Sequence, residues 1–110
     1  MSQVKPYWVA GKPRTSPAVH EVRSPFDGHM VDRHALPTPE DVDEAVAAAV
    51  DVQPQALATT AAQRADALMH VSQQIAARAD EIAHLITAEN GNTLMLSRRE
   101  VPRGASTFRW

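Results

Sequence analysis

The residues that could carry chemistry are scattered along the chain and form no recognised catalytic motif. The 110 residues include no cysteine, which excludes a thiol nucleophile, a disulfide and a thiolate zinc site. The glycines stand at positions 11, 28, 91 and 104, so none are spaced as in G-x-G-x-x-G or a P-loop. No serine sits in a G-x-S-x-G elbow. We therefore predict no catalytic and no cofactor-binding residues.

The histidines do not form a metal site. His29 and His34 are five residues apart, which places them on opposite faces of a strand. His70 and His84 are fourteen residues apart on one expected helix, a separation of about 21 Å. We interpret these side chains as surface or packing residues and predict no metal-binding residues.

The neighbouring carboxylates do not favour acid–base catalysis. Asp43 and Glu44 are adjacent in the sequence, as are Asp80 and Glu81, so each pair points apart on a helix. Solvated helix faces explain these two pairs better than paired catalytic acids do.

Arginines accumulate near the end of the chain. Four arginines and a single acidic residue, Glu100, give this segment a local charge of +3. The arginines are Arg98, Arg99, Arg103 and Arg109. This segment could meet a phosphate or an acidic protein surface. We favour ion pairs of a helix face within a larger fold.

Overall charge and hydrophobicity exclude further classes of protein. Lys and Arg total 11 and Asp and Glu total 13, a net charge of −2, which argues against a generally basic nucleic-acid binder. No segment approaches the roughly 20 apolar residues of a membrane span, and residues 1–6 lack the apolar run of a signal peptide. We expect a cytoplasmic protein without nucleic-acid or membrane partners.

Residues 1–37 are rich in proline and are predicted to form short strands. Residues 7–10 form a β-prone run, and residues 20–23 and 29–36 flank a turn. The turn, residues 24–28, ends in Asp-Gly, where glycine accepts a positive φ. The sequence thus predicts an N-terminal β-hairpin.

Residues 38–110 are rich in alanine and are predicted to be helical. A first helix, about 39–51, begins at the cap Thr38 and should stop close to Pro54. Its expected buried face has helical spacing: Val42, Ala45, Val46, Ala49 and Val50.

Two further helices are predicted. One, about 61–90, begins with a Thr60–Gln63 capping box, carries one apolar stripe and ends at Asn90-Gly91. The other, about 94–110, should kink at Pro102. The predicted fold is mainly α with an N-terminal β-hairpin, in which residues 1–37 and 38–110 form one incomplete domain.

In their order these segments resemble the start of the aldehyde dehydrogenase superfamily. Residues 8–12 look like the opening strand and turn of that family, residues 24–28 like its N-P-x-T-G turn, and residues 38–49 like the helix that follows. The stripe from Arg64 and Leu68 to Glu89-Asn90-Gly91 is similar to the long second helix, and residues 100–101 and 106–110 to the next helix. The aromatic pattern A-F-x-x-W of many members is replaced here by Gln53 and Ala56.

The resemblance implies the N-terminal segment of an α/β cofactor domain. Family members are NAD(P)-dependent and oxidise aldehydes to carboxylic acids through a cysteine and a glutamate, whose positions lie downstream of the matched region. The resemblance therefore implies a chain that is inactive alone, binds no NAD or NADP itself, and packs on the rest of that fold or on an oligomer partner. The alternative is a non-catalytic helical protein-interaction module.

Overall fold

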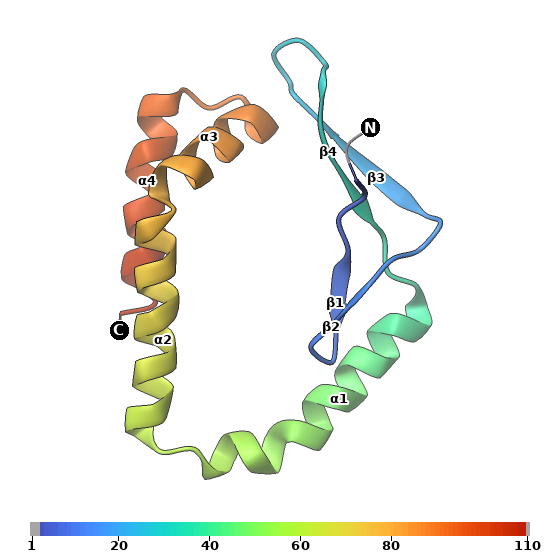
Figure 1. Cartoon of the computed structure of the whole chain (residues 1–110), viewed down its shortest axis with the longest axis vertical. Coiled ribbons are helices and arrows are strands. Elements are labelled where there is room, and N and C mark those ends of the chain that lie inside the picture. Colours follow the sequence, from blue (N-terminus) through green and yellow to red (C-terminus); the bar gives the residue numbers. More distant parts are fainter. Residues whose placement is uncertain (1–2, 110) are drawn as a thin grey trace. The chain divides into compact units, whose positions relative to one another are not determined.

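The computed structural model describes residues 3–109, which fall into two compact units (Figure 1). The hairpin unit contains residues 3–23 and 28–58, and the helical unit contains residues 24–27 and 59–109. These bounds differ from the predicted division at residue 37, because the first helix groups with the strands. None of the helices in the part of the chain described here is long and apolar enough to cross a membrane.

The hairpin unit starts with strands β1 (Tyr7–Val9) and β2 (Lys12–Arg14), which pair antiparallel. The register pairs Val9 with Lys12, so Ala10 and Gly11 form a two-residue loop. Both loop residues have positive φ, 49° and 75°, as a type I′ turn requires. The turn therefore follows β1 directly.

A second hairpin consists of β3 (Val19–Arg23) and β4 (Met30–Ala35). Lys5 extends this sheet, because its N–H donates to the Arg33 carbonyl and its own carbonyl accepts from the Ala35 N–H. The described chain thus has two antiparallel hairpins where the sequence predicted one. Each is too small to be stable in water by itself.

Helix α1 (Pro39–Ala58) begins as predicted but ends seven residues later than predicted. Thr38 caps it, since its hydroxyl accepts from the Asp41 N–H while the Asp41 carboxylate accepts from the Thr38 N–H. Pro54 lies inside the helix and does not end it. A proline removes a single ladder hydrogen bond, and the alanine and leucine that follow favour helix.

The helical unit contains two helices where one of thirty residues was predicted. Helix α2 (Ala61–Ala77) starts at the predicted Thr60–Gln63 capping box. Arg78 leaves the helical conformation at φ −104°, ψ 19°, and α3 (Ala79–Asn90) follows at once. The prediction of one continuous helix over residues 61–90 was wrong, because the apolar stripe keeps its spacing across a break of a single residue and so does not indicate it. Asp80 and Glu81, acids in the first turn of α3, were the missed start signal.

Helix α4 (Leu94–Thr107) lies against both α2 and α3 (Figure 1). It runs unbroken past Pro102, so the proline does not split the helix, and the predicted end at residue 110 lies outside the described residues. Its buried side carries Ser97, Val101 and Ala105. We attribute the continuity to the packing of this side, which offsets the hydrogen bond that proline removes.

The loop residues Ser24–Asp27 belong to the helical unit, and Pro25 lies beside Gly91 at the end of α3. Gly91 ends α3 in the left-handed conformation at φ 77°, as the sequence predicted. A Cβ atom built on Gly91 would lie 2.8 Å from Cγ of Pro25. Gly91 is thus required both by the backbone conformation and by the closeness of Pro25.

Candidate functional site

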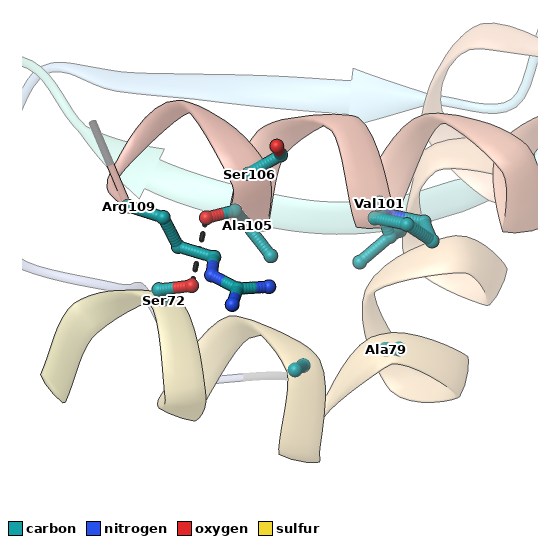
Figure 2. Close-up of a pocket in the computed structure, with 8 residues that line it drawn as sticks. Ser72, Ala79, Val101, Ala105, Ser106 and Arg109 are labelled. Atoms are coloured by element: carbon teal, nitrogen blue, oxygen red, sulfur yellow. Dashed lines mark hydrogen bonds between the residues drawn. The ribbon is translucent and has the colours of Figure 1, made fainter. Parts of the chain in front are cut away.

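One hollow in the helical unit lies between α2 and α4 and has a volume of about 290 Å³ (Figure 2). Small side chains form most of its wall, with two hydroxyls and one guanidinium: Ser72, Ala76, Ala79, Val101, Pro102, Ala105, Ser106 and Arg109. These small side chains allow the two helices to approach closely.

Ser72 connects the two helices through a buried hydrogen bond. Its hydroxyl donates to the Ala105 carbonyl at 2.8 Å (Figure 2). Ala105 stands in the last turn of α4, where carbonyls lack helical partners. Ser72 therefore satisfies a backbone group, which is a structural role.

Ser72 shows no sign of activation as a nucleophile. A serine nucleophile needs a base within hydrogen-bond reach. The Ser72 hydroxyl is committed to a carbonyl, and the exposed His70, two residues away on α2, points from a different side of the helix. Arg109 extends into the hollow as its only charged side chain among the described residues (Figure 2). The hollow can accommodate a side chain and offers no acid–base pair.

A second polar cluster lies in the hairpin unit around Asp41. Its carboxylate accepts from the Tyr7 hydroxyl at 2.7 Å, from the Thr38 N–H and hydroxyl, both at 2.9 Å, and from Arg14 at 3.1 Å. The hydrogen bond from the Thr38 N–H, followed by that from Tyr7, holds the Asp41 pKa far below its ordinary value. The bond to Asp41 in turn raises the Tyr7 pKa.

The Asp41 cluster attaches the first hairpin to α1. Arg14, at the end of β2, also binds Glu44 through two contacts of 2.7 and 2.5 Å. A carboxylate with such a low pKa is a poor proton acceptor near neutral pH, and a phenol with a raised pKa stays protonated. No signal in the sequence indicated this role of Asp41, because its partners Tyr7 and Arg14 come from distant positions.

The structure separates the remaining carboxylates and histidines that the sequence singled out. Asp80 pairs with Arg98 of α4 and with His84, whereas Glu81 pairs with Arg78. Glu44 binds Arg14, and Asp43 is exposed. His34 lies 4.0 Å from Asp32, and His29 is exposed. Over residues 3–109 no three His, Cys, Asp or Glu side chains are grouped to hold a metal ion.

The four arginines of the last segment have different surroundings. Arg98 forms an ion pair with Asp80 across α3 and α4, at 2.8 Å, as expected for pairs within the fold. Arg99 and Arg103 line a shallow hollow together with Glu100, so a counter-charge is close by. Arg109 points toward Ser72 instead (Figure 2). The structure therefore does not gather them into one anion site.

Large apolar side chains remain exposed in both units. In α1 none of the residues is buried, and Val42, Val46 and Val50 are 52%, 59% and 62% exposed. In α2 the predicted stripe is buried only at Ser72, while Leu68 is 44% exposed. The expectation that these faces are buried is thus not met within either unit. Exposed apolar surface of this kind marks an interaction surface.

Comparison with protein families finds a match over nearly the whole chain. The model of the aldehyde dehydrogenase family matches residues 8–110. A malonate-semialdehyde dehydrogenase of Bacillus pumilus is 31% identical over 97 residues, covering 88% of this chain and 19% of the relative. A 3-sulfolactaldehyde dehydrogenase of Priestia megaterium is 31% identical over 110 residues, covering 98% of this chain and 23% of the relative.

Solved structures show the same likeness. Aldehyde dehydrogenase 21 from Physcomitrella patens, in complex with the reaction product succinate, superposes with a TM-score of 0.93 at 27% identity, over 99% of this chain and 23% of its own. PnpE in complex with nicotinamide adenine dinucleotide gives a TM-score of 0.87 at 34% identity, over 97% of this chain and 22% of the PnpE chain. The chain thus spans about a fifth of the length of the relatives it matches.

Proposed function

Because the chain belongs to the aldehyde dehydrogenase family, we propose that it serves as the N-terminal structural segment of an NAD(P)-dependent enzyme that oxidises an aldehyde to a carboxylic acid. The observation that carries the proposal is a match from residue 8 to residue 110 against relatives about five times as long. The order of its hairpins and helices, with TM-scores near 0.9, supports the same assignment.

The residues of this segment do not fit a bound nicotinamide cofactor. The glycines that could form a phosphate cradle are far apart in the sequence, and the space beside Gly91 is occupied by Pro25. The hollow between α2 and α4 offers a single guanidinium. We infer that NAD or NADP, which the relatives use, binds to other parts of such an enzyme.

The chain also lacks the thiol on which such an oxidation would depend. It contains no cysteine, so no thiohemiacetal can form on its own residues. Its polar clusters hold helices and hairpins together, as the contacts of Ser72 and Asp41 illustrate. The proposed role is therefore to fold as part of one domain, residues 1–37 and 38–110 included, against the rest of the enzyme in the cytoplasm.

A direct assay tests this proposal. The purified chain is mixed with malonate semialdehyde or 3-sulfolactaldehyde and NAD⁺ or NADP⁺, and formation of the reduced nicotinamide is followed by absorbance. We expect no turnover, while a full-length relative assayed in parallel is active. Aldehyde-dependent cofactor reduction by the purified chain would overturn the proposal.

The alternative function is that of a helical interaction module that binds an unrelated protein. The exposed apolar faces fit both functions. Recovery of the chain from its source in a stable complex with a protein of another family would favour the alternative. Recovery as part of an aldehyde dehydrogenase would favour the structural segment.

A further inference from the structure

Helix α1 has two distinct apolar sides. Ala45 and Ala48 are half-buried and lie in a hollow beside Ala10 and Gly11 of the first hairpin turn. The second side is a row at a spacing of four residues, namely Val42, Val46 and Val50, which are 52%, 59% and 62% exposed. Residues at this spacing follow one side of a helix, and the hairpin leaves that side uncovered.

A groove continues this valine row onto the first hairpin. It has a volume of about 350 Å³ and is lined by Tyr7, Trp8, Val9, Pro37, Asp41, Val42, Ala45 and Val46. The indole of Trp8 is 67% exposed, an unusual state for a large aromatic surface. We name Trp8, Val42, Val46 and Val50 the valine face.

The valine face presents little free charge to an approaching partner. Asp41 is the one charged residue that lines the groove among residues 3–109, and Tyr7, Thr38 and Arg14 all donate to its oxygens. A partner that covers the groove therefore needs apolar side chains and no cation to meet Asp41.

The acidic residues of α1 are at other positions around the helix. Glu40, Asp43 and Asp51 are exposed. The helical repeat places Glu40 and Asp51 on the side of the helix opposite Val42, whereas Asp43 borders the valine row, three residues before Val46. Ala47, also exposed, lies between Asp43 and Asp51 at a spacing of four residues. The helix thus offers an apolar side and a charged side for direct comparison.

We propose that the valine face is the docking surface for an apolar segment from the remaining four fifths of the aldehyde dehydrogenase polypeptide. The relatives supply the argument for this occupant, because this chain covers only 19–23% of their length while superposing closely on that part. Within such a protein a face with three valines and a tryptophan gains stability when apolar surface covers it. The inference rests on the proposed function and adds the surface and its chemistry.

The test uses the chain and the complementary part of a relative. The probe is the Priestia megaterium 3-sulfolactaldehyde dehydrogenase without the residues that match this chain, produced separately. Its Kd for the chain is measured by titration of labelled chain, for the original sequence and for Val46→Lys. Because Val46 is exposed, Val46→Lys should leave the helical content of the free chain unchanged in circular dichroism.

Ala47→Lys is the matched control, since it adds the same side chain one residue away and places it near Asp43 and Asp51. We expect the original chain and Ala47→Lys to bind alike, and Val46→Lys to bind at least about tenfold more weakly, because burying an ammonium group in an apolar contact is costly.

Three results would overturn the docking surface. These are equal binding by all the chains, no binding by the original chain, and self-association that Val46→Lys abolishes, which would make a second copy the occupant. Equal binding by all the chains, or self-association, would leave the proposed function standing, because the chain could still pack on the enzyme through another surface. Failure of the original chain to bind would count against the packing role too, and recovery of the chain from its source as part of an aldehyde dehydrogenase would then separate the two. That function fails separately, through the turnover assay of the chain alone.

Discussion

The hydroxyl of Ser72 in α2 reaches 2.8 Å to the carbonyl of Ala105 in α4 and satisfies a backbone group that the end of that helix leaves without a partner. The two residues are 33 positions apart in the sequence. Both are buried, so this bond is a specific polar connection between the two helices.

Ser72→Ala should destabilise the helical unit by about 1–3 kcal/mol, because the Ala105 carbonyl would remain buried without a donor. The measurement is amide hydrogen exchange with mass spectrometry, which separates residues 59–109 from the hairpin unit. Ser106→Ala is the control, since Ser106 is exposed and lines the same hollow. Equal protection of α4 in both variants would contradict the role given to Ser72.

Gly91→Ala should destabilise the chain, and Gly104→Ala should stabilise it. At Gly91 a methyl group would meet Pro25 at 2.8 Å and φ is 77°, so the loss should exceed about 1 kcal/mol. Gly104 lies inside α4 with no atom within 4 Å of a built Cβ, so alanine should add about 0.5–1 kcal/mol. Urea unfolding followed by circular dichroism measures both. A shift of the free energy of unfolding in the same direction by both substitutions would contradict the different roles given to Gly91 and Gly104.

Ala10→Asn should strengthen the first hairpin by roughly 0.5–1 kcal/mol, because Ala10 has φ 49° and Asn-Gly suits a type I′ turn. Hydrogen exchange at β1 and β2 should slow. Ala18→Asn serves as the control, since Ala18 is exposed and its φ is not positive. Faster exchange in β1 of Ala10→Asn would show that the turn type is wrong.

Acid should weaken the attachment of the first hairpin to α1 through Asp41. The pKa of Asp41 is lower in the folded chain than in the unfolded chain. The stability that its ionised carboxylate contributes is therefore fully present above the ordinary carboxyl pKa of about 4, and it is lost as the pH falls from there toward the pKa of the folded state. Asp41→Asn removes the charge at every pH. Hydrogen exchange of β1 in the two proteins should therefore differ at neutral pH and converge in acid. A difference that grows as pH falls would refute the assignment.

Local signals in the sequence predicted several parts of the structure correctly. Thr38, the Thr60–Gln63 pair and Gly91 act through neighbours within a few residues, so they fixed the starts of α1 and α2 and the end of α3. The same holds for the turn at Gly28, whose φ is 75°. The exclusion of thiol chemistry rests on composition alone, because a chain without cysteine has no thiol in any fold.

Proline and apolar periodicity were less reliable guides. Pro54 and Pro102 each remove one hydrogen bond, and whether a helix survives this loss depends on its remaining bonds and its packing. The stripe of residues 61–90 continues across Arg78, where the chain leaves the helical conformation. Periodicity identifies an apolar side of a helix and does not identify what covers it, as the exposed Val46 demonstrates.

The sequence alone determined that this chain carries helical segments with defined caps, a glycine turn at Gly28 and no cysteine, since each of these depends on residue type and short spacing. Only the tertiary structure decided that Ser72 meets Ala105, that Tyr7 and Arg14 converge on Asp41, and that the valine face stays open. These contacts join residues 27 to 34 positions apart, and no local preference encodes which distant groups will meet. Their geometry arises when the hairpins and helices pack.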